Sequence, residues 1–212
     1  MSEYLSDAEQ KEQIHEWWKE NGRFILAGVV LGLMGIFGWR YWITFQDSQA
    51  SKASVLYEEM LSAVNEDELD MAKQKLDVIS SDFKSTVYLS QAHLLMAKTA
   101  VLTDDLNSAV DHLETALAAS KDRELAELIR FRLAKVRVEL KEYDVALDLL
   151  NSVKSDSYTP LVEEIRGDIY RAQGDVVKAR SAYVAAQAAM QVTPIGDPNL
   201  LQMKLSDLGV AN

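Results

Sequence analysis

The sequence contains no cysteine and only three prolines among its 212 residues. Without cysteine, the chain cannot form disulfide bonds, thiolate zinc sites, iron–sulfur clusters or a cysteine nucleophile. Three prolines and nine glycines leave few points at which regular structure must break. This scarcity favours an all-α fold.

Positive charge is also scarce, because 22 Lys and Arg stand against 33 Asp and Glu and give a formal net charge of −11. A nucleic-acid partner requires a basic surface, so we expect none. The sequence contains no Gly-rich phosphate loop, nucleophile elbow or paired-carboxylate motif. Its histidines, His15, His93 and His112, stand apart from any HExxH motif and indicate ordinary surface or groove residues rather than metal ligands. We therefore expect no enzyme activity, catalytic residue, metal or cofactor.

One apolar run dominates the N-terminal part of the chain. Sixteen residues between Arg23 and Arg40 carry no charge, and apolar and aromatic residues continue after Arg40. A spanning helix needs about 20 such residues, and Arg40 can extend its charge to the lipid headgroups. Trp18 and Trp39 would stand about 31 Å apart on a helix, which matches a bilayer core with an aromatic belt on each side. We predict a transmembrane helix over residues 23–43, in contact with the lipid bilayer.

The flanks of this run suggest an orientation. Three cations (Lys11, Lys19 and Arg23) precede it, and two (Arg40 and Lys52) follow it closely. By the positive-inside rule, this small difference favours a cytoplasmic N-terminus. The acidic start and the lack of a small-residue cleavage site argue against a signal peptide, whereas a buried core helix remains an alternative. We predict a cytoplasmic segment 1–22, the span 23–43 and a translocated domain 46–212.

A stripe of glycines lies within the apolar run. Gly28, Gly32 and Gly35 share one helical face and contain a GxxxG motif. Small residues allow a second membrane helix to approach closely, although such spacing also arises by chance. The stripe is a candidate intramembrane packing face for another membrane protein or for a second copy.

The remaining sequence has helical spacing of its apolar residues, interrupted by short polar breaks. Residues that cap helices occupy these breaks, so eight breaks predict about nine helices after residue 46. The breaks are Asn65-Glu66-Asp67, Ser80-Ser81-Asp82, Thr103-Asp104-Asp105, Lys121-Asp122, Lys141-Glu142, Ser155-Asp156-Ser157, Gly174-Asp175 and Thr193-Pro194.

An internal repeat relates these helices. Small residues recur at Ala72, Ala109, Ala146 and Ala179, with offsets of 37, 37 and 33 residues. We predict a divergent tetratricopeptide-like α-solenoid of about four helix pairs, capped by a helix near 197–208, with an unrelated helical bundle as the alternative. The last unit matches the tetratricopeptide spacing best, through Gly167, Tyr170, Gly174, Ala179, Tyr183 and Ala186.

A solenoid of this kind binds partners on the concave face that its first helices line. Leu94 and Phe131 can be read either as groove residues or as packing between helices, and that alternative stays open. The predicted protein-binding groove consists of Tyr57, Leu61, Gln91, Leu94, Lys98, Phe131, Lys135, Glu164, Asp168 and Arg171.

Nearly the whole chain resembles the YfgM-like family, the ancillary subunits of the bacterial SecYEG translocon. Short motifs on both sides of the apolar run and in the last two helix pairs carry this resemblance. They are Glu20-Asn21-Gly22, Gly38-Trp39-Arg40-Tyr41-Trp42, Leu133-Ala134-Lys135-Val136-Arg137-Val138, Arg166-Gly167-Asp168, Gly174-Asp175, Ala179-Arg180-Ser181-Ala182, Val192-Thr193-Pro194 and Gln202-Met203-Lys204.

The resemblance implies a single-pass protein of the bacterial inner membrane with its C-terminal domain in the periplasm. It implies three kinds of partner: the SecYEG translocon, a membrane-anchored periplasmic chaperone of the prolyl-isomerase-like type, and translocating polypeptides. The expected function is a non-enzymatic interaction module that helps to transfer secreted or envelope proteins to periplasmic chaperones. The alternative is a structural scaffold or assembly factor of an inner-membrane or envelope complex that does not contact clients.

Overall fold

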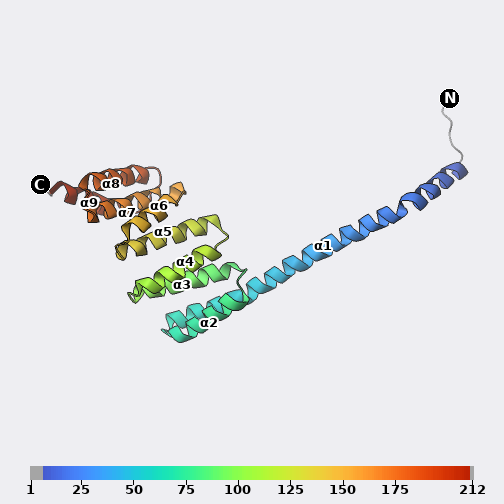
Figure 1. The fold of residues 1–212 in the computed structure, drawn as a ribbon, viewed down its shortest axis with the longest axis horizontal. Helices are drawn as coiled ribbons and strands as arrows, with labels where there is room; N and C mark the ends of the chain where they lie inside the picture. The colour runs from blue at the N-terminus through green and yellow to red at the C-terminus, as the bar shows by residue number, and fades with distance from the viewer. Residues whose placement is uncertain (1–6, 211–212) are drawn as a thin grey trace, which may run out of the picture. The chain divides into compact units, whose positions relative to one another are not determined.

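The structure, a computed structural model, describes residues 7–210. Residues 1–6 of the predicted cytoplasmic segment and residues 211–212 of the predicted domain lie outside this range. All regular structure within it is helical, which confirms the all-α fold (Figure 1). The chain divides into two compact units, Met1–Ser51 and Lys52–Asn212.

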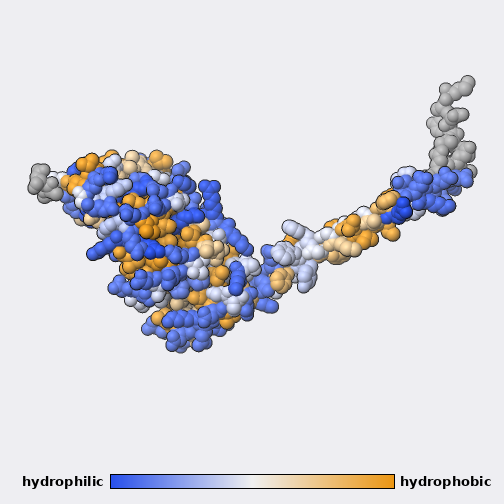
Figure 2. Space-filling view, viewed as in Figure 1, coloured by the Kyte–Doolittle hydropathy of each residue, from blue (hydrophilic) through white to orange (hydrophobic). Residues whose placement is uncertain are grey.

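The first unit contains most of α1 (Asp7–Asn65), the helix that carries the apolar run. In the described residues, α1 is the one helix long and apolar enough to cross a membrane. Only 6% of its most apolar 18-residue window is buried inside the protein, which argues against a core helix. Leu31 and Phe37 are each 68% exposed, and Figure 2 shows this stretch of α1 as hydrophobic surface. Side chains of this kind require an apolar surrounding, as a bilayer provides.

The second unit consists of helix pairs that follow one another along the domain (Figure 1). The end of α1 pairs with α2, then α3 with α4, α5 with α6 and α7 with α8, before the final helix α9. These four pairs and the cap confirm the predicted solenoid. The bounds are α2 (Leu69–Asp82), α3 (Val87–Leu102), α4 (Leu106–Ala119), α5 (Arg123–Glu139), α6 (Tyr143–Asn151), α7 (Thr159–Ala172), α8 (Val176–Met190) and α9 (Pro198–Val210), with a 3-10 turn η1 (Asp156–Tyr158) before α7.

The small residues that define the internal repeat are buried in the structure. Ala72, Ala109, Ala146 and Ala179 are all fully buried on the second helix of their pairs. A methyl group at these positions lets the second helix lie close to the first, and larger apolar side chains one turn later fill the remaining space. In the fourth pair that side chain is the fully buried Tyr183.

The fourth pair shows why a glycine stands in its first helix. A Cβ atom added to Gly167 would lie 2.3 Å from two ring carbons of Tyr183, a distance that real Cβ contacts do not reach. Gly167 therefore creates the space that the Tyr183 ring occupies, as its position in the repeat predicts.

The turn inside each pair has the same geometry in all four pairs. Asp67, Asp104, Lys141 and Gly174 each have a positive φ, between 59° and 82°. The next backbone N–H in each turn donates to a carbonyl five residues earlier, from Glu68 to Ala63 in the first pair and at equivalent positions in the other three. A residue in the left-handed region followed by a hydrogen bond to the carbonyl five residues earlier is the Schellman motif, which ends many helices. Only the fourth turn uses glycine.

Two helix ends differ from the predicted positions. The sequence places a break at Ser80–Asp82, but α2 continues to Asp82 and the chain bends at residues 83–86. The cap was expected near 197–208, yet α9 extends to Val210 through Gly209. Leu201 and Leu208 of α9 are buried against Ala179 and Tyr183, so the helix covers the last pair as predicted.

Candidate binding groove

An apolar groove lies between α3 and α5, the first helices of the second and third pairs. Leu94, Ala97, Val101 and Leu102 line it from α3, at the spacing of one helix face. Leu113 of α4 and Val136 of α5 complete the apolar lining of a hollow of about 280 Å³. Leu102 is 77% exposed and Val101 is 44% exposed, although half of the residues of α3 are buried.

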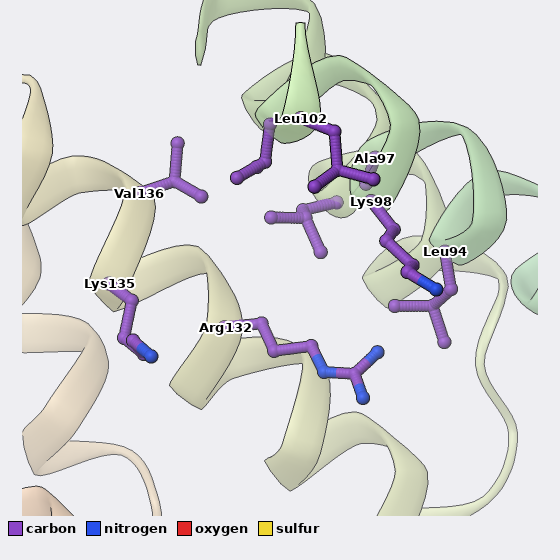
Figure 3. A pocket seen from close by; sticks show the side chains of 9 residues that line it. Leu94, Ala97, Lys98, Leu102, Arg132, Lys135 and Val136 are labelled. Carbon is purple, nitrogen blue, oxygen red and sulfur yellow. The ribbon is translucent and has the colours of Figure 1, made fainter. Parts of the chain in front are cut away.

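Three cations border this apolar lining. Figure 3 shows Lys98, Arg132 and Lys135 around the right, bottom and left of the hollow, with Leu102 and Val136 in the upper part of the view. None of the three forms an ion pair among the described residues, whereas Arg137, also on α5, binds both Glu114 and Glu142. The groove therefore combines an apolar lining with unpaired positive charge.

The local sequence fixes the helices that carry these residues. The Asp105 side chain accepts a hydrogen bond from the Ser108 N–H and caps α4 directly after α3. Asp122 accepts from the Leu125 N–H and caps α5 in the same way. Such caps satisfy donors that a helix cannot pair internally, so both ends beside the groove are well defined. The core below contains Ala97, Leu113 and other apolar side chains of α3, α4 and α5.

The ten predicted groove residues are spread over the first helices of all four pairs. Leu94, Lys98 and Lys135 line the groove between α3 and α5. Phe131 is buried and its ring stacks on that of Tyr158, with centroids 5.7 Å apart, so it packs between elements, as the open alternative allowed. The others lie elsewhere on the first helices: Tyr57 against Tyr88, Leu61 exposed on α1, Gln91 half-buried on α3, and Glu164, Asp168 and Arg171 on α7.

Glu164 and Asp168 bind α9. The Lys204 ammonium donates to Glu164 at 2.7 Å and to Asp168 at 2.8 Å, and the Tyr183 hydroxyl donates to Asp168 at 2.7 Å. Burial alone would lower the pKa of Lys204, but the bonds to both carboxylates outweigh it and raise that pKa. Burial and then the Asp168 carboxylate raise the pKa of Tyr183. This network attaches the cap to the fourth pair.

The sequence analysis missed several residues that line the groove. Val101 and Leu102 lie one turn after the predicted Lys98, and Arg132 lies one turn before the predicted Lys135. Extending the predicted face by one helical turn in each direction would have found them. Leu113 could not be found in this way, because it comes from a second helix.

The structure also brings together His93 of α3 and His112 of α4. Their Nδ1 atoms lie 3.0 Å apart between α3 and α4, although 19 residues separate them in the chain. Burial, and then the neighbouring His112, lower the pKa of His93 to about 4. Burial also lowers the pKa of His112, despite the opposing charges of Asp111 and Asp105. Among the described residues, no three His, Asp or Glu are arranged to hold a metal ion.

The glycine stripe of α1 is exposed. Added Cβ atoms on Gly28, Gly32 and Gly35 would meet nothing within 4 Å among the described residues. The stripe therefore has room for a second helix, and its packing role stays a prediction.

Comparison with known proteins agrees with this architecture. The family model described as a tetratricopeptide repeat-like domain matches residues 15–210. A solved structure of BtubC from P. vanneervenii covers 77% of this chain and 82% of its own, at 19% identity and a TM-score of 0.47, which is too distant to support an argument.

Named relatives match over nearly their whole length. The ancillary SecYEG translocon subunit of Haemophilus influenzae is 33% identical over 98% of this chain and 100% of its own. The protein of the same name from Escherichia coli is 33% identical over 99% of this chain and 100% of its own, and that of Aggregatibacter actinomycetemcomitans is 34% identical over 98% and 100%. These matches confirm the resemblance that the sequence motifs indicate. The chain belongs to the family of the ancillary SecYEG translocon subunits, built on a tetratricopeptide repeat-like domain.

Proposed function

We propose that this chain is a single-pass inner-membrane protein that associates with the Sec translocon and binds other proteins through its solenoid, without catalysing a reaction. The full-length match to relatives named ancillary SecYEG translocon subunits is the observation that carries this proposal. The exposed apolar stretch of α1 and the groove between α3 and α5 are the physical parts that such a role requires.

The finer proposal concerns orientation. Residues 1–22 lie in the cytoplasm, residues 23–43 span the membrane and residues 46–212 form a periplasmic domain. Cations are slightly more numerous before the span than after it, which supports this orientation. The domain then stands on the side at which translocated chains emerge, where it helps their transfer to a membrane-anchored prolyl-isomerase-like chaperone.

The lack of cysteine makes the orientation directly testable. Single variants Ser2→Cys and Ser206→Cys are exposed in cells to a membrane-impermeant maleimide after the outer membrane is opened. The orientation predicts labelling at position 206, which is exposed on α9, and none at position 2 until the inner membrane is lysed. The reverse pattern would refute it.

The association itself is tested by purification of the full chain in a mild detergent and identification of the proteins that remain bound. Recovery of translocon subunits supports the proposal, whereas their absence contradicts it. Photocrosslinkers at Lys98 and Lys135 then distinguish the roles, because the transfer role predicts crosslinks to arrested secretory chains and to the chaperone.

A scaffold without client contact is the second candidate, and the shortness of the groove favours it. Only three of the ten predicted groove residues line one hollow, and Lys204 already occupies Glu164 and Asp168. Because contacts within the chain cover part of the predicted groove, less of it is left to accept varied client segments. Crosslinks from Lys98 and Lys135 to one protein only would support the scaffold.

The glycine stripe gives the complex a second contact. We expect Gly28, Gly32 and Gly35 to pack on a membrane helix of a partner, because nothing in the described chain covers them. Gly28→Leu with Gly32→Leu should weaken recovery of that partner in detergent, while Val30→Ala, a change on the opposite face of the helix, should not. Unchanged recovery in both variants would rule out the stripe as a contact.

A further inference from the structure

The groove between α3 and α5 has the size of a side-chain pocket. Its volume of about 280 Å³ lies just below the range of roughly 300–1,000 Å³ for pockets that enclose a small molecule. It is partly open to solvent, and Leu94 and Val101 of α3 and Val136 of α5 line it. This shape accepts one or two apolar side chains of a longer segment.

The polar groups of the groove can only donate hydrogen bonds. Lys98 and Lys135 carry ammonium groups and Arg132 carries a guanidinium, and none of these groups has an acceptor atom. A ligand that pairs with them must therefore supply acceptors, and negative charge makes those acceptors stronger. Asp and Glu side chains fit this requirement.

The charge of the groove opposes that of its surroundings. Four of the 22 Lys and Arg and six of the 33 Asp and Glu precede residue 46, which leaves a net charge of −9 for residues 46–212. Glu139 lies one turn after Lys135 on α5, but the two form no ion pair in the part of the chain that the structure describes. Three unpaired cations around an apolar hollow are thus a local exception on an acidic domain.

Two other anionic occupants fit less well. A nucleic acid or an anionic lipid surface offers many negative charges over a wide area, and the domain as a whole would repel either. A short segment meets only the basic border of the groove and can place an apolar side chain in the hollow. Electrostatic complementarity of this local kind selects a partner more than it strengthens binding.

We propose that the groove between α3 and α5 binds a segment of a partner protein in which apolar side chains alternate with Asp or Glu. The apolar side chains contact Leu94, Val101 and Leu102, and the carboxylates accept hydrogen bonds from Lys98, Arg132 and Lys135. This inference rests on the proposed function, because it names the chemistry of the segment that the solenoid would bind.

The test uses the full chain in nanodiscs and three short fluorescein-labelled peptides, which alternate Leu with Glu, Leu with Lys, or Ser with Glu. Fluorescence anisotropy should show binding of the Leu–Glu peptide, with the other two at least about tenfold weaker, since each lacks one half of the match. Raising the salt concentration should weaken binding, because the charged border is exposed to solvent. Equal binding of all three peptides would overturn the proposal.

Two matched variants locate the site. The triple change Lys98→Gln, Arg132→Gln and Lys135→Gln should weaken the Leu–Glu peptide about tenfold. The control removes the same charge from exposed positions away from the groove, through Lys73→Gln, Lys84→Gln and Arg180→Gln, and should leave affinity unchanged. Circular dichroism confirms that both variants remain folded. Equal loss in both variants would overturn the proposed site.

Two further readouts separate the alternatives. Displacement of the peptide by phosphatidylglycerol vesicles would identify the site as a lipid site and overturn the proposal. Recovery of translocon subunits in detergent tests the proposed function separately, since a chain can bind the peptide without the translocon or the reverse. Loss of peptide binding in the triple variant with normal translocon recovery would support the groove and leave the association intact.

Discussion

Charged side chains lie between α7 and α9 and also between α3 and α5. In the part of the chain that the structure describes, the cation of the first junction forms ion pairs, whereas the three cations of the second do not. Between α7 and α9, Lys204 is held by Glu164 and Asp168, and the side chains of Lys204 and Glu164 are only 15% and 13% exposed. Between α3 and α5, Lys98, Arg132 and Lys135 border an open apolar hollow and form no ion pair in the described chain. α9 follows α8 as α5 follows α4, so the difference lies in side chains rather than in topology.

The difference separates structure from binding. Charges at the junction between α7 and α9, the closed junction, join two helices of the same chain. Removal of one partner should lower stability, because it leaves the other charge poorly solvated and unpaired. The charges at the junction between α3 and α5, the open junction, form no ion pair among the described residues. Their removal should therefore change the stability of the domain little and the binding of a partner more. Measurements of unfolding and of binding on the same variants can therefore assign a role to each junction.

The largest effect is expected at Gly167, which lies on α7 inside the fourth pair, next to Asp168 of the closed junction. The change Gly167→Ala places a Cβ at a position 2.3 Å from the Tyr183 ring carbons, so α7 and α8 must separate or the buried ring must move. We expect a loss of about 2–3 kcal/mol in the free energy of unfolding. Thermal unfolding of the full chain in nanodiscs, followed by circular dichroism, measures it.

The control for that change is Gly209→Ala in α9. A Cβ there would meet only an Arg180 nitrogen at 4.0 Å, so stability should change by less than about 0.5 kcal/mol. If Gly167→Ala and Gly209→Ala had equal effects, the close approach of α7 to Tyr183 would not be what stabilises the fourth pair.

The second prediction compares one cation from each junction. Lys204→Met leaves Glu164 and Asp168 without their partner in a mostly buried position, which should cost about 2 kcal/mol, less than for a fully buried pair. Arg132→Met removes an exposed and unpaired charge, so it should stay within about 0.5 kcal/mol. Urea unfolding of both variants in nanodiscs checks this contrast. Equal losses would contradict the assignment of separate roles.

Much of the architecture follows from the sequence because its cause is local. The small residues Ala72, Ala109, Ala146 and Ala179 recur at fixed offsets, and each is buried where the repeat requires. The apolar run of α1 is recognisable by its length and composition alone. Helix ends were less accurate, as at Asp82, because capping residues tolerate several positions.

The candidate site was only partly predictable, because it depends on which side chains meet across helices. The sequence places Glu164 and Asp168 on a first helix, but it does not show that Lys204 approaches them from 36 or more residues away. In the same way, nothing in the sequence pairs His93 with His112. Long-range pairing decides which part of the concave face remains open.

The third prediction uses pH to weaken the contact between α3 and α4, two helices that line the open groove. The pKa of His93 is about 4 in the folded chain, below its usual 6.5, so the unfolded chain binds more protons between these pH values. The contribution of neutral His93 to the free energy of unfolding is therefore fully present above pH 6.5, and it is lost as the pH falls towards 4. From pH 7.5 to pH 5 we expect α3 and α4 to lose about 1–2 kcal/mol.

Hydrogen exchange of the full chain at these two pH values, corrected for the intrinsic exchange rate, measures this loss. The variant His93→Gln removes one of the two histidines whose pKa is lowered and should reduce the pH dependence in α3 and α4, and the double variant His93→Gln with His112→Gln should abolish it. The amides of α8 and α9 serve as the internal reference, because the histidine pair does not contact them. Equal loss of protection in α3, α4, α8 and α9 would show that the histidine pair is not responsible.

The smallest effect concerns the turns that end the first helices. Those beside the open groove end in Asp104 and Lys141 with φ near 60°, whereas the helix of the closed junction ends in Gly174. A left-handed residue with a Cβ costs about 1–2 kcal/mol, and glycine avoids this cost but has more freedom to lose on folding. Lys141→Gly should therefore stabilise the domain by about 0.5 kcal/mol, and Gly174→Ala should destabilise it by about 1 kcal/mol. Urea unfolding midpoints of the two variants in nanodiscs measure both changes. A loss of stability in Lys141→Gly would mean that the Lys141 side chain, rather than backbone freedom, determines this turn.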